Sequence, residues 1–378
     1  MKLFDYPIIK GKPKVRARDL AISEKKILYN FNKTSKRIAK HGMFILGHEV
    51  KNFENKISKF LNTDNALAVN SGTSAIYLAL KSLNLKTNDE VITTPMSWLI
   101  TSSAILLAGG KPIFADVDDD YNLDPNSVIK KINSKTKAVV VTHFYGRVAQ
   151  MNELRKISNK FNLILIEDSA QAFGASLNNK KAGTYGDFGT FSFSPMKVFG
   201  SFGNAGIIVF KNKKYLNKLI SLRTCGTINR EICKFPELKF DIDPIHAAHI
   251  NENFNVYNQL KKKRLTIAKS YFANLANHFE NLPKIEKEYN HTFYDYTIQV
   301  NQREKVIKYL YNKGIEVKVR HPILINKQPI FKNLKQTKLK KAEYFVKKIL
   351  SLPMHYNLKN NEIDYVCEHL IKAKKNFG

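Results

Sequence analysis

Cysteine is scarce in this chain of 378 residues, and the few cysteines are poorly placed for cross-linking. Cys225, Cys233 and Cys367 are odd in number, and no two of them form a C-x-x-C pair. This spacing argues against a disulfide framework and against a structural zinc site. The N-terminal residues also carry charges where a signal peptide needs an apolar core. We therefore expect a mature, cytoplasmic protein.

Long apolar runs are nearly absent as well. The stretch 91–110 carries no charge and reaches the length of a membrane span. Pro95 and the scattered threonine and serine residues within it predict a strand, a turn and a buried helix instead. We therefore expect no membrane association.

Acidic residues are outnumbered by basic ones, 32 to 62, which gives a formal net charge of +30. Basic surfaces bind nucleic acids by neutralising phosphates. Here lysine and arginine are spread along the whole chain, without an arginine-rich arm, a zinc finger or an aromatic RNA-binding signature. We therefore expect no nucleic acid partner. The charge favours a small anionic substrate instead.

Alternating strand and helix patterns fill the first part of the chain. The predicted strands include 66–69, 91–94, 113–115, 138–142 and 163–167, and the predicted helices include 49–61, 73–80 and 97–108. Such alternation predicts an α/β fold in which helices flank a mainly parallel sheet as three αβα layers. We assign this large domain to residues 1–243.

A second region begins where Asp243 and Pro244 resemble an N-cap and the first position of a long helix. A chain of this length is too long for one compact core, so a smaller second domain is expected. Strand-like patterns at 294–300 and 315–320 and a helical pattern at 303–312 predict an α+β domain over 244–378.

One lysine and one aspartate suggest the chemistry. Asp168 ends an apolar run that is typical of a buried strand, and Lys197 follows on a polar loop before a glycine-rich stretch. A lysine and a carboxylate in this arrangement favour Schiff-base catalysis with pyridoxal 5′-phosphate (PLP). The lysine holds the aldehyde, and the aspartate keeps the pyridine nitrogen protonated.

Other residues can complete such a cofactor site. Gly72 and Thr73 open a predicted helix, so their N–H groups and the Thr73 hydroxyl can receive a phosphate. Ser192, in the loop before the lysine, can add a second hydroxyl. Trp98 follows a strand end and can stack on a planar ring, and Gln171 can hydrogen-bond the ring hydroxyl. Taken singly, each residue is also typical of an ordinary helix cap, strand or core.

Together these residues resemble the DegT/DnrJ/EryC1/StrS family of aminotransferases, which act mainly on nucleotide-linked keto-sugars. The resemblance covers nearly the whole chain. Its segments are 43–50, 71–73, 116–118 with 121–125, HFYG at 143–146, EDSAQA at 167–172, FSFSPMK at 191–197, 205–206 and 247–248. Several of them are specific to the family in both spacing and residue type.

The resemblance implies the aspartate aminotransferase fold (fold type I) and a homodimer with shared active sites. It gives the residues above the same cofactor-binding roles. Relatives that remove a hydroxyl carry histidine in place of Lys197, so the lysine favours transamination over dehydration. The acidic run 116–120 lacks the glycine and the distal glutamate of an EF-hand, and we expect no metal site. Family position also suggests further pocket residues: Phe44, His143, Tyr145, Arg320 and His321.

Two departures from the family concern the substrate. The family commonly has a histidine where Cys225 stands, and near Lys239 an asparagine that reaches the cofactor phosphate of the partner subunit. Lys239 is therefore a candidate cofactor-binding residue that grips the cofactor phosphate or a substrate phosphate. An ordinary surface lysine is the alternative interpretation.

The leading hypothesis is transfer of an amino group, from L-glutamate, to a keto-sugar nucleotide in amino-sugar biosynthesis for surface polysaccharides. A second hypothesis keeps the reaction but replaces the substrate with a small phosphorylated ketone such as dihydroxyacetone phosphate. Cys225 and Lys239 motivate it. A third is a regulatory or DNA-associated cofactor-binding protein, against which the intact Lys197 and Asp168 argue.

Overall fold

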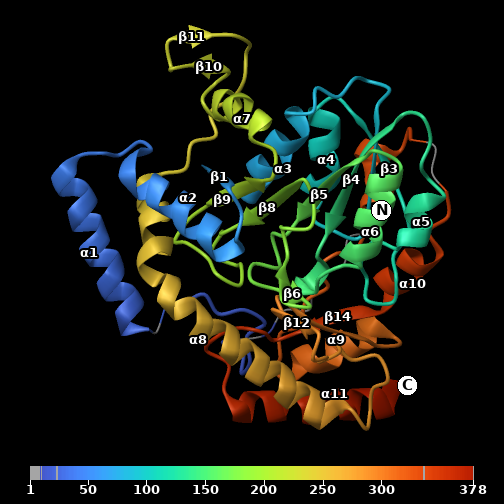
Figure 1. The fold of residues 1–378 in the computed structure, drawn as a ribbon. Helices are drawn as coiled ribbons and strands as arrows, with labels where there is room; N and C mark the ends of the chain where they lie inside the picture. The colour runs from blue at the N-terminus through green and yellow to red at the C-terminus, as the bar shows by residue number, and fades with distance from the viewer. Residues whose placement is uncertain (1–8, 10, 23, 335–336, 378) are drawn as a thin grey trace.

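A seven-stranded sheet forms the centre of the computed structural model, which describes residues 9, 11–22, 24–334 and 337–377 (Figure 1). Its strand order is β1-β9-β8-β5-β4-β2-β3. The strands are β1 (Asn65–Val69), β2 (Glu90–Thr93), β3 (Lys111–Phe114), β4 (Thr136–Thr142), β5 (Ile164–Asp168), β8 (Phe188–Ser192) and β9 (Gly206–Phe210). Neighbouring strands from β8 to β3 are parallel, whereas β9 is antiparallel to β8 and to β1. The predicted mainly parallel sheet is confirmed.

Helices cover both faces of this sheet and complete three layers. One face packs against α3 (Gly72–Lys81), α4 (Ile100–Leu107) and α7 (Leu216–Arg223), and the other against α2 (Gly47–Leu61), α6 (Met151–Lys160) and the first half of α8 (Pro244–Leu275). In β4, Ala138 and Val140 face the first group, whereas Val139 and Val141 face the second. Strands that are apolar on both sides are typical of a parallel sheet covered on both faces.

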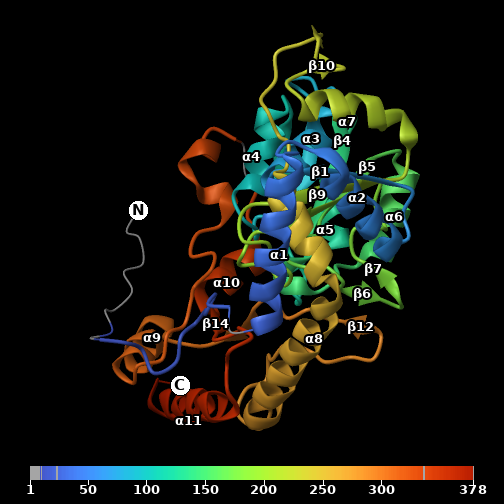
Figure 2. The same cartoon turned by 90° about the vertical axis from the view of Figure 1, so that its left-hand side faces the viewer.

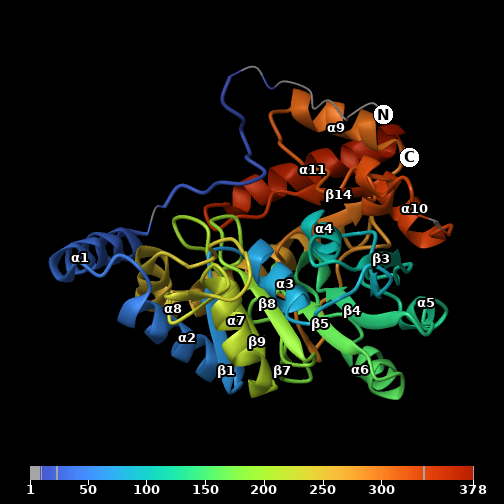
Figure 3. The same ribbon diagram turned by 90° about the horizontal axis from the view of Figure 1, so that it is seen from above.

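The C-terminal region has a hydrophobic core of its own. There β13 (Tyr296–Gln299) pairs antiparallel with β14 (Ile349–Leu352), and α9 (Arg303–Asn312), α11 (Asn360–Phe377) and the second half of α8 pack on this pair. Figure 3 shows α9, α11 and β14 to one side of the large sheet. Ile250 of α8 lies in the core of the sheet region and Tyr271 in the C-terminal core. Because one helix serves both cores, the division at Asp243 stays a prediction.

The segment 315–320 differs from its predicted strand. It contains only isolated bridges, from Ile315 to Val15 and from Lys318 to Ser351. An alternating apolar pattern indicates a half-buried extended chain, but a strand also needs a continuous partner, and here two unrelated segments each supply one residue. The predicted helix at 97–108 likewise begins later, at Ile100.

The remaining elements lie around this frame. They are α1 (Lys25–His41), α5 (Pro125–Ile129), α10 (Lys340–Lys348), β6 (Ser176–Leu177), β7 (Lys180–Lys181), β10 (Thr227–Ile228), β11 (Ile232–Cys233), β12 (Tyr289–Asn290) and short 3-10 helices at Phe144–Gly146, Lys213–Tyr215, Ile325–Lys327 and Pro329–Phe331. Figure 2 shows α1 running beside α8 and the β10–β11 hairpin projecting from the body of the molecule. Two apolar residues of this hairpin, Ile228 and Ile232, are 43% and 56% exposed.

The uncharged stretch 91–110 folds into most of β2, a turn and α4, as predicted. It is apolar because both faces of β2 are covered: Val91 packs in one core cluster and Ile92 in another. Across the described residues, the structure contains no helix with the length and apolar character that a membrane crossing requires.

Candidate active site

Asp168 is the last residue of β5 and is only 4% exposed. Its Oδ2 accepts a hydrogen bond from Thr101 Oγ1 at 2.8 Å, and its Oδ1 accepts one from the Ala170 N–H at 3.2 Å. Thr142 Oγ1 lies 3.5 Å from Oδ2. These donors fix the orientation of a carboxylate at the C-terminal edge of the parallel strands, where open α/β sheets bind their ligands.

Lys197 lies in a tight turn after β8. Its backbone N–H donates to the Ser194 carbonyl at 2.9 Å, and the Ser201 N–H donates to the Phe193 carbonyl at 2.7 Å, which closes the loop. The Lys197 ammonium Nζ lies 5.1 Å from the centroid of the Tyr294 ring. A flexible lysine is thus anchored at its backbone and placed near an aromatic residue from the C-terminal region.

The N-terminus of α3 meets the end of β8. Ser71 caps the helix, since its Oγ accepts from the Ser74 N–H at 3.1 Å. A Cβ on Gly72 would lie 2.5 Å from Ser192 Cβ, so only glycine permits this close approach. Thr73 in the first turn is exposed. The N–H groups of a helix N-terminus with two adjacent hydroxyls, those of Thr73 and Ser192, form an arrangement suited to a phosphate.

A cavity of about 350 Å³ joins these groups. All the predicted site residues except Lys239 line it: Gly72, Thr73, Trp98, Asp168, Gln171, Ser192 and Lys197. Gln171 is held there because its Oε1 accepts from the Tyr145 N–H at 2.8 Å, which leaves its amide N–H groups to donate elsewhere. Trp98 is 64% exposed and lies at the rim.

The C-terminal region supplies another part of the lining through Tyr294, Arg320 and His321. Arg320 Nε lies 3.2 Å from Asp295 Oδ2. Burial lowers the pKa of His321 to about 4, so its imidazole is neutral at neutral pH. Arg320 and His321 were expected only through the family resemblance. Tyr294 was missed, because no local pattern shows that its backbone N–H pairs with the Tyr145 carbonyl at 2.9 Å.

Lys239 lies outside this lining. Its side chain is 57% exposed, and its Nζ lies 4.0 Å from Asp241 Oδ2. The same carboxylate lies 3.7 Å from Arg223 Nε and 3.7 Å from Arg230 Nη2. Three cations thus surround one buried acid beside the projecting hairpin. Cys225, at the other departure from the family, is exposed. A role for Lys239 across a subunit interface stays a prediction.

Three other expected pocket residues also lie outside the cavity lining. His143 is fully buried, with its Nε2 donating to Glu167 Oε2 at 2.8 Å and its Nδ1 accepting from the Ala149 N–H at 3.1 Å. This pattern assigns the ring proton to Nε2 and gives His143 a structural role. Tyr145 is buried, whereas Phe44 is 61% exposed.

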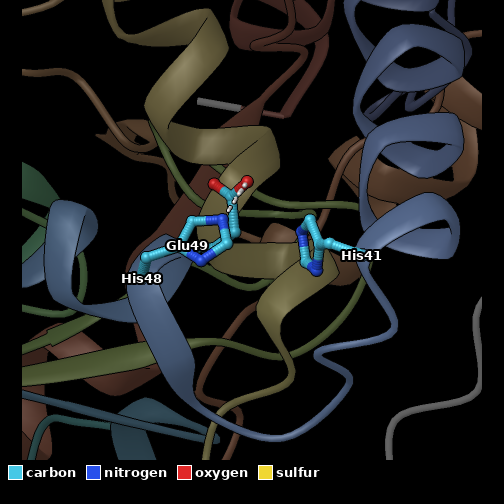
Figure 4. A group of neighbouring side chains, drawn as sticks. All are labelled: His41, His48 and Glu49. Carbon is cyan, nitrogen blue, oxygen red and sulfur yellow. Dashed lines mark ion pairs between the residues drawn. The ribbon is translucent and has the colours of Figure 1, made fainter.

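A separate cluster lies between the end of α1 and the start of α2 (Figure 4). Among the described residues, His41, His48 and Glu49 bring potential metal-ligand atoms within 4.8 Å of one another. However, Glu49 Oε1 accepts from Arg37 Nε at 2.9 Å, and Glu252 Oε1 accepts from Arg37 Nη1 at 2.7 Å. A metal would compete with a guanidinium held by two carboxylates. The cluster is therefore best described as an ion-pair network that ties α1 to α2 and α8.

Comparison with protein families agrees with this geometry. The model of the DegT/DnrJ/EryC1/StrS aminotransferase family matches residues 26–371, nearly the whole chain. The chain belongs to this family. It is therefore a PLP-dependent aminotransferase, as the sequence predicted.

Relatives with names that indicate their activity or role match most of the chain. A pleiotropic regulatory protein of Geobacillus stearothermophilus is 31% identical over 90% of this chain and 93% of its own length. A UDP-N-acetyl-3-dehydro-alpha-D-glucosamine 3-aminotransferase of Acidithiobacillus ferrooxidans is 31% identical over 86% of this chain and 89% of its own. A 3-oxo-glucose-6-phosphate:glutamate aminotransferase of Bacillus subtilis is 29% identical over 88% of this chain and 78% of its own length.

Solved structures of similar proteins share the fold over nearly their full length. DesV of S. venezuelae, in complex with a ketimine intermediate, has a TM-score of 0.90 at 26% identity and covers 96% of this chain and 98% of its own. NtdA of Bacillus subtilis, with bound cofactor PMP, has a TM-score of 0.88 at 28% identity. The match covers 99% of this chain and 88% of NtdA. These neighbours confirm fold type I.

The cavity itself fits the family's cofactor. It offers a helix N-terminus with a glycine whose Cβ would collide, the Ser192 hydroxyl, the oriented Asp168 carboxylate and the Lys197 amine. These are the groups that a phosphate, a pyridine nitrogen and an aldehyde require.

Proposed function

We propose that this aminotransferase takes an amino group from L-glutamate and places it on a keto-sugar carried by a nucleoside diphosphate. The reaction would take place in the cytoplasm, and its product would serve amino-sugar biosynthesis for surface polysaccharides. The observation that carries the proposal is the cavity in which Asp168, Lys197 and the N-terminus of α3 converge. The UDP-sugar specificity in the name of the relative from A. ferrooxidans supports the choice of substrate.

The sheet region would bind the cofactor. Gly72 and Thr73 would donate backbone N–H groups to the phosphate, and Thr73 and Ser192 would add their hydroxyls. Asp168, oriented by Thr101, would hold the proton of the ring nitrogen, while Gln171 would donate to the ring oxygen. Trp98 at the rim would stack on the ring. When bound, PLP supplies the electron sink that makes a carbon next to nitrogen acidic.

Lys197 would hold the cofactor through Nζ and later carry a proton at that atom between the cofactor carbon and the substrate carbon. The closed turn around Ser194 keeps its backbone in place. The long side chain keeps the freedom to reach both carbons. Water must be excluded while the proton moves, and the neighbouring Tyr294 ring gives that side of the lysine an apolar surface.

A second copy of the chain would complete the site, as a homodimer. The β10–β11 hairpin projects from the body and exposes Ile228 and Ile232, and the adjoining Leu238 is 70% exposed (Figure 1). Apolar residues on a projecting hairpin support burial against a partner. Lys239, next to Leu238, would then reach the partner's cofactor phosphate and add a full charge to a site otherwise built from N–H and hydroxyl groups.

A small phosphorylated ketone is the second candidate substrate. It is favoured by Lys239, a cation where an amide is usual, and by Cys225. The relative from B. subtilis is named for a sugar phosphate without a nucleotide and for glutamate as donor. A purely regulatory role, suggested by the name of the relative from G. stearothermophilus, would not require the anchored Lys197 and the oriented Asp168.

Separated half-reactions test this proposal. The PLP-loaded protein is converted to its amino form with L-glutamate, the donor is removed, and return of the original absorbance is followed after adding a keto-sugar nucleotide or dihydroxyacetone phosphate. We expect rapid return with the keto-sugar nucleotide. Return with the ketone phosphate alone would replace the leading substrate by the second one. Failure to accept the amino group from glutamate would refute the proposed donor.

A further inference from the structure

Three buried hydroxyl groups form a row that ends at the Asp168 carboxylate. Thr142 Oγ1 lies 3.1 Å from Ser97 Oγ, which lies 2.8 Å from Thr101 Oγ1. Thr101 Oγ1 donates to Asp168 Oδ2 at 2.8 Å. We propose that this row is a polarised hydrogen-bond chain that keeps the carboxylate charged toward the ring nitrogen of the cofactor, and that its three members are positioning residues. The inference rests on the proposed function, because it deepens the role of Asp168.

The direction of every hydrogen bond in the row follows from its end. An ionised carboxylate can only accept, so Thr101 donates its single hydroxyl proton to Asp168. The Thr101 oxygen can then only accept from its other neighbour, which makes Ser97 the donor across the 2.8 Å contact. Ser97 has no proton left for Thr142, so Thr142 donates to Ser97. All three hydroxyl protons therefore point along the row toward the carboxylate.

Hydroxyl groups that point in one direction stabilise the charge at the end of their row. Ser97 is 3% exposed, Thr101 0%, Thr142 2% and Asp168 4%, so water screens these groups very little. Hydrogen bonds in such surroundings polarise one another, and a hydrogen bond to a charged group is stronger than one between neutral groups. The chain therefore favours the charged carboxylate and opposes transfer of the ring proton to it.

The fold brings the three hydroxyls together from two adjoining parts of the sheet region. Thr142 ends β4 and lies opposite Asp168, the last residue of β5, in the parallel register of the two strands. Ser97 and Thr101 flank the start of α4, where the Thr101 N–H donates to the Trp98 carbonyl at 3.1 Å. The turn that carries Trp98, which we expect to stack on the ring, thus also supplies two of the three hydroxyls.

The carboxylate keeps room for the cofactor beside this chain. A carboxylate has about four acceptor positions. Thr101 occupies one on Oδ2, and the Ala170 N–H occupies one on Oδ1 at 3.2 Å. Asp168 and Ser97 both line the candidate active-site cavity. The ring N–H can therefore reach the carboxylate without displacing Thr101.

The test compares PLP with 1-deaza-PLP, in which a carbon replaces the ring nitrogen and no ring N–H reaches Asp168. Equilibrium binding of each to the cofactor-free full chain is followed by absorbance. We expect Thr101→Val, which keeps the branched shape, to raise the Kd of PLP about tenfold and that of 1-deaza-PLP less than twofold. Thr101→Ser keeps the hydroxyl and should match wild type. So should Thr93→Val, because the buried Thr93 hydroxyl donates to the Val140 carbonyl at 3.2 Å, outside the chain.

A double-mutant cycle distinguishes a chain from separate contacts. Among the hydrogen bonds of the described residues, Ser97 reaches the carboxylate only through Thr101. We expect Ser97→Ala to raise the Kd of PLP about threefold in the wild-type background and to have no further effect in Thr101→Val, where the chain is already broken. Thr142→Val should raise the Kd of PLP about twofold, and neither single variant should change that of 1-deaza-PLP.

Several results would overturn the inference. Equal losses of PLP and 1-deaza-PLP in Thr101→Val would give Thr101 a structural role only, and equal losses in Ser97→Ala would place Ser97 against the cofactor itself. Additive effects of the two substitutions would show separate contacts. If Thr101→Val does not fold by circular dichroism, an unchanged Kd of PLP in Ser97→Ala overturns the chain. Asp168→Asn that binds both cofactors as wild type does would instead refute the proposed role of Asp168, so the two failures are distinguishable.

Discussion

The two walls of the candidate active-site cavity are built in different ways. The wall from the sheet region consists of residues at strand ends and a helix start, such as Asp168, Ser192 and Gly72, each fixed by hydrogen bonds or packing within one continuous frame. The wall from the C-terminal region presents Arg320, which lies outside regular structure and is oriented by an ion pair with Asp295. We infer that the first wall is set by the cofactor, which is constant, and that the second sets substrate choice.

The largest effect is expected from substituting Asp168, a charged residue in the wall from the sheet region. Asp168→Asn keeps the shape of the side chain but removes the charge that we propose holds the proton on the ring nitrogen. We expect kcat to fall about 100-fold or more, equivalent to about 2.7 kcal/mol. Steady-state kinetics at saturating PLP measures this, with Asp364→Asn on the exposed face of α11 as the control. A rate near that of wild type would separate Asp168 from the cofactor.

A smaller effect is expected at Lys239, which belongs to neither wall within one chain. Lys239→Ala should weaken PLP binding about tenfold, because one charged contact to phosphate is lost, whereas Lys234→Ala on the same hairpin should not. Hybrid dimers that combine one Lys197→Ala subunit with one Lys239→Ala subunit test whether Lys239 acts across the interface. If Lys239 acts across it, each hybrid contains one intact site and shows more activity than either parent at limiting PLP. Hybrids no more active than the Lys239→Ala parent would place the residue on the surface.

The smallest effect concerns acid stability of the C-terminal wall. Burial lowers the pKa of His321 from 6.5 to about 4. Below pH 6.5 the unfolded chain therefore binds a proton at this residue that the folded chain does not, and stability falls as the pH drops toward 4. Lowering the pH from 7.5 to 5.5 should reduce the contribution of His321 to the free energy of unfolding by about 1 kcal/mol.

Urea unfolding at these two pH values measures the acid effect. His321→Gln should lose about 1 kcal/mol less than wild type on acidification, whereas the exposed His48→Gln should behave as wild type. The same pH dependence in wild type and His321→Gln would show that the imidazole is not buried as the structure has it.

The sequence predicted the sheet wall far better than the C-terminal wall, for a physical reason. A strand that ends in a carboxylate and a glycine that opens a helix are local patterns, so Asp168 and Gly72 can be placed without long-range information. Tyr294 enters the cavity only because its backbone pairs with Tyr145, which lies far from it in the sequence. The orienting pair of Arg320 and Asp295 likewise has no local signature.

The same distinction explains the errors in secondary structure. The helix predicted at 303–312 agrees with α9 at both ends, because its apolar spacing is contained in one segment. The strand predicted at 315–320 is absent, because its pairing depends on Val15 and Ser351, from opposite parts of the chain. The predicted role of Lys239 requires the surface of a partner subunit, which a single chain does not contain.

The most direct test of the account is to identify the lysine that holds the cofactor. The chain is loaded with PLP and reduced with sodium borohydride, which fixes the cofactor covalently to its lysine, and mass spectrometry of the digested protein locates the modification. We predict a single stoichiometric label on Lys197, lost in Lys197→Ala without loss of folding by circular dichroism. A label on another lysine of this lysine-rich chain, or no stoichiometric label, would contradict the assignment of the cavity as the active site.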